Sequence, residues 1–594
     1  MRLRVIRLIF IVVISLVVLR LAFWQVVQAD NLTAKAEGQR ILTRIVVAPR
    51  GEIRFADSSI LAASQPMYQL FAQPKVISKQ FLKPGEDPNS KLSLINAYKK
   101  TFAQQLTLEL TKNISLLEAS NEAEVKDLQQ KQQDSISAQL NKNLYWVDLN
   151  QIVNLETKKR LEKLNLTGLG FEPTTGRFYP EGSSSAHLLG FVSKDAYGNQ
   201  KGSLGVEGFY DGELKGINGQ KVEEKDALGL PILIGKFFEK PPKPGKQITL
   251  TIDRTIQHVV EQKLADGMEK YGAKSASAIV MDPKTGAILA MASLPSYDPA
   301  GTKLYPAENF KNPVSADTYE PGSTFKTVIM SAALNEKIVD DKTRCEICTG
   351  PVGVGGYSIG TWNNKYYPNS TISDIIIHSD NVGMVYISRL LGQQKELEYI
   401  KKFGFGKITG LDVQDEFSPD LRPDKSWGEI DYATASFGQG ISVTPIQLVR
   451  AVGAISNGGK LMEPHLVSEI KGSDGTFEIK PKIVSEPITL ETAAKMTQIM
   501  IRAVKEGESH LSQIPGYIVA GKTGTAQVSV AGHYDPTKTI ASFVGFAPAQ
   551  NPRFVMLVRY QEPSASQHGA ETAAPTFAQI SREIFNYYGI APSE

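Results

Sequence analysis

The sequence predicts a multidomain chain in which an N-terminal transmembrane helix precedes two α+β domains. Three observations lead to this fold class: a long apolar segment near the N-terminus, a stiff proline-rich break in the middle of the chain, and strand patterns at both ends of the second half with helical patterns between them. The length of 594 residues fits several domains, and 42% hydrophobic with 21% charged residues is the composition of a folded protein.

The first segment is a predicted membrane anchor. Three arginines within residues 1–7 precede an apolar stretch over residues 8–27, which is long enough to cross a bilayer as a helix. Because basic residues stay on the cytoplasmic side, we expect residues 1–7 in the cytoplasm and the rest of the chain outside, with Trp24 at the outer interface. A cleaved signal peptide is the alternative, since residues 8–19 have the length of its apolar core. In both cases the bulk of the chain is exported.

Charge and cysteine content argue against nucleic-acid-binding and metal-binding proteins. A formal charge of +3 is too small for a chain of this size to indicate nucleic-acid binding, and we find no basic run with interleaved aromatic residues. Cys345 and Cys348 form a lone Cys-x-x-Cys motif. Zinc would need two further ligands, and the seven histidines show no metal-binding spacing, so we expect no metal. A local disulfide or two free thiols in a loop remain as alternatives.

The first exported domain is predicted over residues 28–245. Residues 106–140 are rich in Gln, Glu, Lys, Leu and Ala with few breakers, which indicates helix. Residues 168–219 are dense in glycine and turn residues, which predicts short strands and turns. The stretch "KPPKPGK" (240–246) cannot continue a helix, so we place the boundary to the second domain, residues 246–594, there.

The second domain opens with a predicted helix capped by Asp253 or Thr251. Its apolar face carries Ile256, Val259, Val260 and Leu264. Residues 275–293 ("SASAIVMDPKTGAILAMAS") form two apolar runs joined by turn residues, and residues 540–560 repeat this form, so both predict β-hairpins. Residues 573–590 are helical in pattern. Strands from both ends and helices between them predict one antiparallel sheet flanked by helices.

Three short motifs follow one another along the second domain. Each alone is weak, because serine and lysine are common in helices and asparagine is common in turns. Together, in this order, they indicate a site. They are Ser-x-x-Lys at Ser323 and Lys326, Ser-Asp-Asn at 379–381, and Lys-Thr-Gly at 522–524, followed by Thr525.

The first and third motifs contain the elements of an activated serine. The hydroxyl of Ser323 is a poor nucleophile without a neighbouring base, and Lys326 lies three residues further along the same helical turn. A lysine amine can act as that base when it is neutral. A second cation at Lys522, together with partial burial, would lower the pKa of Lys326 towards the working range. We therefore expect Lys326 to be the general base, while charged Lys522 attracts an anionic substrate.

The ordered triple is similar to that of penicillin-binding proteins and class A β-lactamases. The chain most resembles the class B penicillin-binding proteins over nearly its whole length. "RGEI" (50–53), "RFYPEG" (177–182), "AHLLGF" (186–191) and "GVEGFYDGELKG" (205–216) resemble motifs of that family's N-terminal domain. One departure is "RFADSSILA" (54–62), where the family usually has a short Asp-Arg-Asn-Gly turn.

This resemblance implies a fold and a reaction. It implies an elongated α+β pedestal of the dimerisation type over residues 28–245 and a serine β-lactamase-like transpeptidase domain over residues 246–594. The expected activity is that of a D,D-transpeptidase, which crosslinks peptidoglycan stem peptides through a serine acyl-enzyme and needs no cofactor.

The resemblance also implies roles for the site residues. The backbone N–H groups of Ser323 and Thr525 would form the oxyanion hole, next to a strand edge with no bulky side chain at Gly524. Ser379 would pass a proton to the leaving amine, and Asn381 would hold Lys326 in place. The hydroxyls of Thr523 and Thr525, with Gly524 between them, are suited to binding a substrate carboxylate.

Several functional alternatives remain open on the sequence. "SFGQGISVTPIQL" (436–448) and "SDNVGM" (379–384) resemble the division-type branch, which favours septal wall synthesis over an elongation role. A β-lactamase, a β-lactam sensor and a non-catalytic division scaffold are the competing classes. The expected partners are peptidoglycan stem peptides, β-lactams as covalent inhibitors, a membrane glycosyltransferase with other division or elongation proteins, and the lipid bilayer. The expected location is the bacterial cell membrane, with a single span and an external catalytic domain.

Overall fold

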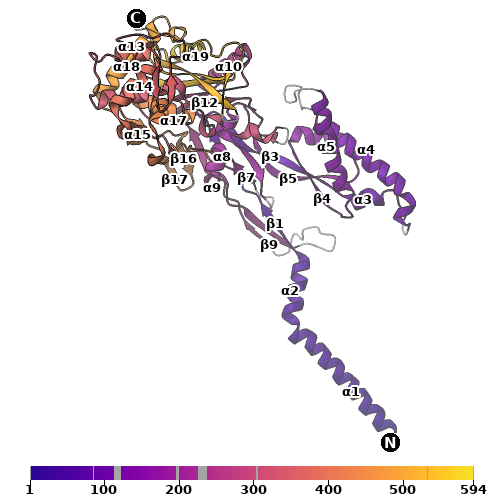
Figure 1. Cartoon of the computed structure of the whole chain (residues 1–594). Helices are drawn as coiled ribbons and strands as arrows, with labels where there is room; N and C mark the ends of the chain where they lie inside the picture. The colour runs from indigo at the N-terminus through magenta and orange to yellow at the C-terminus, as the bar shows by residue number, and fades with distance from the viewer. Residues whose placement is uncertain are drawn as a thin grey trace. The chain divides into compact units, whose positions relative to one another are not determined.

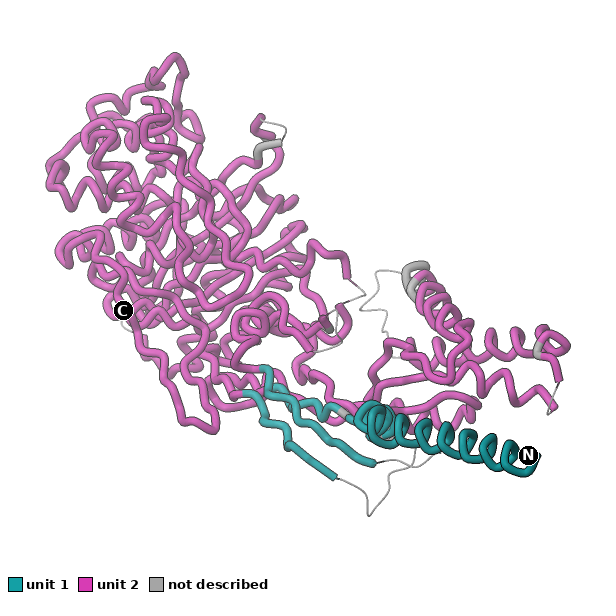
Figure 2. Tube along the Cα trace, turned by 90° about the horizontal axis from the view of Figure 1, so that it is seen from below, with its two compact units in different colours: residues 1–50, 215–245 teal, residues 51–214, 246–594 magenta. Residues whose placement is uncertain are grey.

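The computed structural model of the chain describes residues 2–83, 86–112, 122–195, 200–224, 237–302, 305–530 and 533–592. The chain forms two compact units, which Figure 2 distinguishes by colour. The first unit comprises residues 1–50 and 215–245, and the second comprises residues 51–214 and 246–594.

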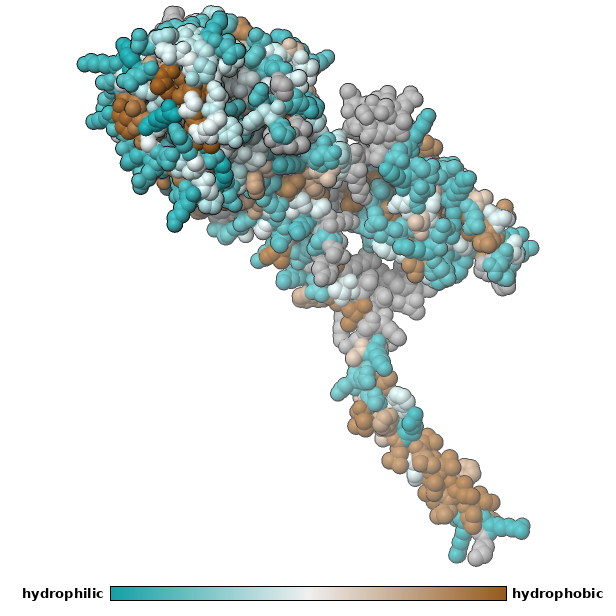
Figure 3. Space-filling model, viewed as in Figure 1, coloured by the Kyte–Doolittle hydropathy of each residue, from teal (hydrophilic) through white to brown (hydrophobic). Residues whose placement is uncertain are grey.

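The first unit contains the apolar N-terminal helix and a small sheet. Helix α1 (Arg2–Ala22) continues through a short π-helix (Phe23–Val27) and is followed by α2 (Ala29–Arg40). Residues Arg2–Val27 are long and apolar enough to cross a membrane, since an 18-residue window within them has a mean hydropathy of 2.7, and Figure 3 shows the hydrophobic residues gathered along this helix. The guanidinium of Arg20 lies 5.1 Å from the ring centroid of Trp24. The sheet has the order β1 (Ile41–Val46), β8 (Gly219–Glu224), β9 (Phe237–Lys240).

The N-terminal part of the second unit is an α+β layer. The long strand β3 (Ile60–Ala72) pairs antiparallel with β4 (Val147–Val153) and with β5 (Leu169–Phe178). The helices beside it are α3 (Pro74–Lys79), α4 (Leu92–Leu110), α5 (Glu122–Leu140) and α6 (Leu155–Lys163). The helix predicted over residues 106–140 therefore corresponds to the end of α4 and all of α5, while residues 113–121 lie outside the described residues.

The glycine-dense stretch differs from its prediction of strands and turns alone. It contains β5, β6 (Phe191–Lys194) and β7 (Gln200–Ser203), but also the short helices α7 (Ala186–Leu189), α8 (Gly205–Phe209) and α9 (Asp211–Leu214). The prediction was wrong for these helices because tertiary contacts, which local composition does not encode, stabilise them. Val206 and Leu214 are fully buried, and the hydroxyl of Tyr210 donates to Asp412 at 2.9 Å.

A buried ion pair brings three of the N-terminal motifs together. The Nε of Arg177 donates to Glu207 at 2.6 Å, and its Nη1 donates to the carbonyl of Gly51 at 2.7 Å. The two side chains are 3% and 0% exposed. Because an unpaired buried charge is costly, each partner fixes the other, and the segments at 50–53, 177–182 and 205–216 are held against one another.

A second sheet of seven strands contains residues from both halves of the chain. The order is β17 (Gly475–Glu478), β16 (Val467–Gly472), β10 (Gln247–Leu250), β2 (Ile53–Arg54), β3, β4, with β5 also paired to β3. Strand β10 is parallel to β2 and antiparallel to β16. The domain boundary placed between residues 245 and 246 stays a prediction.

The C-terminal part contains a five-stranded antiparallel sheet (Figure 1). Its order is β12 (Ile288–Leu294), β11 (Ser275–Met281), β21 (Phe554–Gln561), β20 (His533–Ala547), β19 (Ala520–Val530). Both predicted hairpins are present. The predicted first helix is α10 (Arg254–Tyr271), capped by the carboxylate of Asp253, whereas the hydroxyl of Thr251 donates to the carbonyl of Ile288.

Different helices cover the two faces of this sheet. Ala278 and Val558 pack with α10 and the C-terminal helix α19 (Ala573–Tyr588). Ile279 and Leu557 pack on the other face, which α17 (Pro445–Ser456) covers. Successive residues of a strand point to opposite faces, so burial on both sides explains the nearly continuous apolar runs of β11 and β21.

The C-terminal part contains further helices and short strands. The helices are α11 (Pro313–Ala316), α12 (Lys326–Asn335), α13 (Ile372–Ile377), α14 (Asn381–Leu391), α15 (Gln393–Lys402), α16 (Glu429–Ala435) and α18 (Leu490–Glu506). The short strands are β13 (Val352–Val354), β14 (Tyr357–Ile359), β15 (Leu461–Met462) and β18 (Ile483–Ser485). Cys345 and Cys348 form a disulfide, the first of the two expected alternatives.

Candidate active site

Ser323 lies in a single 3₁₀ turn, η5 (Gly322–Phe325), directly before α12. Residues three apart on a 3₁₀ helix lie above one another, so Ser323 and Lys326 share one face. Gly322 has a φ of +56°, which favours glycine, and its N–H donates to the carbonyl of Gly438 at 3.0 Å. The turn is therefore held by the segment that contains Gly438, far away in the sequence.

Gly524 allows strand β19 to lie against this turn. A Cβ atom at this position would be 2.9 Å from the Thr324 side chain and 3.0 Å from the carbonyl oxygen of Pro321. It would also be 2.5 Å from the Oγ of Ser542. β19 is an edge strand of the sheet, and the missing side chain brings its backbone next to Ser323.

Lys326 is fully buried and contacts the second motif directly. Its Nζ donates to the carbonyl oxygen of Ser379 at 2.5 Å, to the Oγ of Ser379 at 3.2 Å and to the Oδ1 of Asn381 at 2.8 Å. The described contacts include none between this Nζ and the hydroxyl of Ser323. The structure thus joins Lys326, Ser379 and Asn381, while the base role of Lys326 towards Ser323 stays a prediction.

The second motif is positioned by two helix caps. Thr371 and Asp374 form a capping box that starts α13, and Asp380 caps α14 by accepting from the N–H groups of Val382 and Gly383. Between the two helices Ser379 has a φ of +55°, which is a strained conformation for serine. This strained residue presents both its carbonyl and its hydroxyl to Lys326.

The two lysines of the site have perturbed pKa values. Burial, followed by the charge of Lys522, holds the pKa of Lys326 well below its usual range, while Asp380 and Glu508 oppose this shift. Burial also lowers the pKa of Lys522, again opposed by Glu508. Both causes agree with the sequence-based expectation for Lys326. Glu508, which acts on both lysines, carries no motif signal in the sequence.

The third motif lies on β19, as its strand-like pattern predicts. The Nζ of Lys522 lies 3.3 Å from the hydroxyl of Thr523, and both side chains are buried. The hydroxyl of Thr525 accepts from the N–H of Gly569 at 3.2 Å. Residues two apart on a strand point to the same face, so the hydroxyls of Thr523 and Thr525 lie on one side of β19.

A further carboxylate that sequence reasoning did not single out supports the Ser323 turn. Glu320 accepts hydrogen bonds at 3.0 Å from the N–H of Gly440 and from the hydroxyl of Tyr534 on β20. Burial raises the pKa of Glu320, although both hydrogen bonds oppose this. The only signal that the sequence offers for this role is the position of Glu320, two residues before Gly322.

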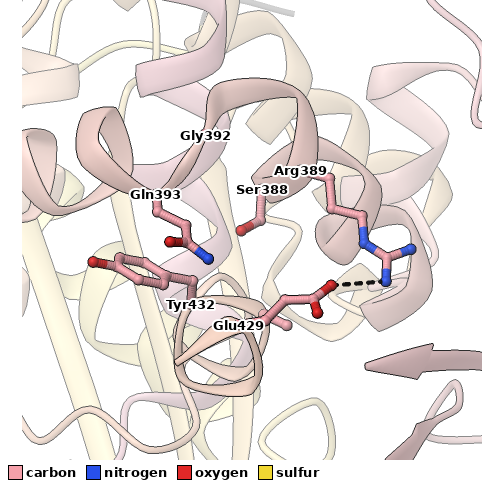
Figure 4. Close-up of a pocket in the computed structure, with 7 residues that line it drawn as sticks. Ser388, Arg389, Gly392, Gln393, Glu429 and Tyr432 are labelled. Carbon is pink, nitrogen blue, oxygen red and sulfur yellow. Dashed lines mark hydrogen bonds and ion pairs between the residues drawn. The ribbon is translucent and has the colours of Figure 1, made fainter. Parts of the chain in front are cut away.

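A small cavity of about 230 Å³ lies near the C-terminal end of α14, which begins at Asn381 (Figure 4). Arg389 and Glu429 form an ion pair of 3.2 Å at this cavity. Ser388, which lines it, donates to Glu396. The side chain of Glu396 is fully buried, and burial raises its pKa to about 8. This buried acid lies on α15 and was not predicted as a functional residue.

The fold and the site together define a protein with an α+β N-terminal part and a serine–lysine pair beside a helix-covered antiparallel sheet. A family model described as "Penicillin binding protein transpeptidase domain" matches residues 276–582, and one described as "Penicillin-binding Protein dimerisation domain" matches residues 45–250. The chain therefore belongs to the penicillin-binding proteins that combine a dimerisation domain with a transpeptidase domain. The class B family and the two-domain fold expected from the sequence are confirmed.

Known proteins share this arrangement over most of their length. Stage V sporulation protein D of Bacillus subtilis (strain 168) is 36% identical over 445 residues, which cover 74% of this chain and 68% of that protein. Peptidoglycan D,D-transpeptidase FtsI of Escherichia coli (strain K12) is 29% identical over 96% of this chain and 89% of its own length. The crystal structure of a peptidoglycan synthetase from Bifidobacterium adolescentis matches with a TM-score of 0.68 at 26% identity, over 93% of this chain and 98% of that one.

Proposed function

We propose that this chain is a peptidoglycan D,D-transpeptidase that works through an acyl-enzyme on Ser323. The observation that carries the proposal is the buried Lys326, which is bound to Ser379 and Asn381 and shares a helical turn with Ser323. A neutral amine keeps two N–H donors for the Ser379 carbonyl and the Asn381 amide oxygen, and it retains one lone pair that can accept a proton. The lowered pKa of Lys326 favours this neutral form.

Acylation requires a proton transfer and the exchange of one bond. Lys326 takes the hydroxyl proton of Ser323, whose oxygen attacks the carbonyl carbon of the penultimate D-alanine of a stem peptide. The oxyanion is stabilised by the backbone N–H groups of Ser323 and Thr525. When the C–N bond breaks, Ser379 passes the proton from Lys326 to the leaving amine, and D-alanine departs.

Transfer to the acceptor reverses these steps. The amine of a neighbouring stem peptide attacks the ester carbonyl and loses a proton towards Lys326, and the ester bond to Ser323 breaks. Ser323 then recovers its hydroxyl proton from Lys326. During acylation, Lys522 with the hydroxyls of Thr523 and Thr525 binds the terminal carboxylate of the stem peptide, which then leaves with D-alanine, and Gly524 leaves room for the substrate beside the strand edge.

A fluorescent penicillin tests the nucleophile. We expect covalent labelling of the full chain in detergent, no labelling of Ser323→Ala, and an adduct on the peptide that contains Ser323. Ser331→Ala is the matched control, because Ser331 lies on α12, directly after the Ser323 turn, and among the described residues its hydroxyl donates only to the carbonyl of Thr327. Labelling of Ser323→Ala at the parent level contradicts the proposal, and rapid turnover of the penicillin without a stable adduct favours a β-lactamase.

We place this activity on the outer face of the bacterial cell membrane, in septal wall synthesis with a membrane glycosyltransferase. The apolar helix Arg2–Val27 supports a single-span anchor. The resemblance of residues 436–448 to the division-type branch supports the septal role over elongation. Complementation of a conditional division mutant tests it: the parent should restore septation, whereas Ser323→Ala should localise and fail. Rescue by Ser323→Ala would support a non-catalytic scaffold.

A further inference from the structure

A basic pocket of about 610 Å³ lies in the N-terminal part of the second unit, between α3, α4 and the segment that follows α5. Its volume is in the range of sites that bind small ligands. The side chains that line it include five cations and one carboxylate. The cations are Lys75, Lys79, Lys83, Lys99 and Lys142, and the carboxylate is Glu86.

Two of these lysines meet on one aromatic ring. The Nζ of Lys75 lies 4.8 Å and that of Lys79 lies 5.1 Å from the ring centroid of Tyr145. Lys79 also donates to the hydroxyl of Tyr145 at 2.9 Å, and this hydrogen bond lowers the pKa of Tyr145. The ring attracts both cations, although like charges repel each other. Both ammonium groups therefore lie around the ring of Tyr145, which lines the pocket.

The single carboxylate is already engaged by other groups. Glu86 accepts from the N–H of Lys83 at 3.0 Å and from the hydroxyl of Ser90 at 3.2 Å, and Lys91, which does not line the pocket, lies 4.0 Å away. None of the five pocket lysines forms an ion pair with another described residue. Lys99 is partly buried, and burial lowers its pKa. The lining of the pocket therefore carries an excess of positive charge, with five lysines against one carboxylate.

We propose that this pocket binds a phosphate-bearing group, either a phosphate ester or a diphosphate. A phosphate carries up to two charges and three strong acceptor oxygens, which suits several separate ammonium groups better than a singly charged ligand does. Lysines act as point charges that surround a phosphate, whereas a planar carboxylate is best matched by the fork of arginine. The described lining residues include no arginine.

The bound phosphate could come from two kinds of molecule, which experiment can distinguish. The phosphate belongs either to a soluble or polymeric phosphate compound or to the headgroup of an anionic lipid. The proposal does not depend on acyl transfer at Ser323, since the pocket residues are separate from all three motifs of the candidate active site.

The test compares two double variants with equal loss of charge. In Lys75→Gln/Lys79→Gln both cations on Tyr145 are removed, whereas Lys159→Gln/Lys163→Gln removes two exposed lysines of α6 outside the pocket. The full chain in neutral-lipid nanodiscs is titrated calorimetrically with inorganic pyrophosphate and, separately, mixed with phosphatidylglycerol or phosphatidylcholine vesicles. Lys83→Gln/Lys142→Gln serves as a second pocket variant, and penicillin labelling reports on folding.

We expect pyrophosphate affinity to fall about ten-fold or more in both pocket variants and to change less than about two-fold in the control, because each pocket variant removes two charged hydrogen-bond donors from the site. If the protein binds phosphatidylglycerol vesicles but not phosphatidylcholine vesicles, and the pocket variants lose this binding, the bound phosphate belongs to a lipid headgroup. Absence of binding to both probes, or an equal loss in pocket and control variants, overturns the proposal. Stronger binding of an acidic peptide than of pyrophosphate at equal salt overturns the phosphate assignment.

Discussion

Replacing the buried acid Glu396 by glutamine is expected to make the protein more stable at neutral and alkaline pH. Glu396 is fully buried on α15, and burial raises its pKa from 4.5 to about 8. One carboxyl oxygen has no hydrogen-bond partner among the described residues, while the other accepts from Ser388. Glutamine has nearly the shape of the protonated acid and cannot ionise.

The size of this stability gain follows from the difference between the pKa of Glu396 in the folded and in the unfolded protein. Each pKa unit corresponds to about 1.4 kcal/mol. Because the pKa of Glu396 is raised on folding, its contribution to the free energy of unfolding is fully present below pH 4.5 and is lost as the pH rises towards 8. The parent is therefore expected to lose about 3 kcal/mol by pH 7 and about 5 kcal/mol above pH 8, whereas Glu396→Gln loses none of it.

Thermal unfolding of the two proteins between pH 5 and pH 9 measures this difference. For a chain of this size, 1 kcal/mol shifts Tm by about 2 °C, so the Tm of Glu396→Gln should exceed that of the parent by about 6 °C at pH 7 and by about 1 °C at pH 5. Glu398→Gln, on the same helix, removes a carboxylate that pairs with Lys395 and Lys402, so this variant should not become more stable than the parent at any pH. If Glu396→Gln also follows the parent from pH 5 to pH 9, Glu396 is not held neutral by burial.

Three further predictions concern the candidate active site and the N-terminal ion pair. In Lys522→Met the pKa of Lys326 should rise because the positive charge that lowers it is gone, so the pH midpoint of penicillin acylation should move to higher pH. Lys522→Arg keeps the charge and should keep the parental midpoint. An unchanged midpoint in Lys522→Met contradicts an effect of Lys522 on the pKa of Lys326. Gly524→Ala should push β19 away from the Ser323 turn and slow acylation about 100-fold, while Gly353→Ala, whose Cβ meets open space, should acylate at the parental rate. Arg177→Met should destabilise the fold by about 3–5 kcal/mol in urea unfolding because the buried carboxylate of Glu207 loses its ion pair with Arg177, and adding Glu207→Leu should recover most of the loss.

Local sequence signals were sufficient to predict much of the fold and to identify the motif residues. The cap at Asp253, the hairpins of β11–β12 and β20–β21 and the strand position of Lys522 each follow from a few neighbouring residues. The approach of Lys326 to Ser379 and Asn381 could be expected only because the three motifs were interpreted jointly. Their geometry depends on the left-handed conformation of Ser379, which no sequence pattern marks.

Other features depend on contacts between distant segments and could not be predicted. Glu320 acquires its role from Gly440 and Tyr534, which lie 120 and 214 residues away. The segment "QQKELEYIKK" is polar in composition and indicates a solvated helix, yet packing buries Glu396 within it. The helices α8 and α9 formed where glycine density predicted turns, because burial of Val206 and Leu214 outweighs their weak local propensity.

The shared seven-stranded sheet has a practical consequence for anyone who wishes to produce the catalytic part alone. A chain shortened to start near residue 246 would keep β10 but lose β2, its parallel neighbour. One side of β10 would then present unpaired N–H and C=O groups to solvent, which invites pairing with other copies. Retaining residues 51–72 would restore this pairing but would leave β3 without β4 and β5, so the catalytic part is best produced together with the whole of residues 51–214.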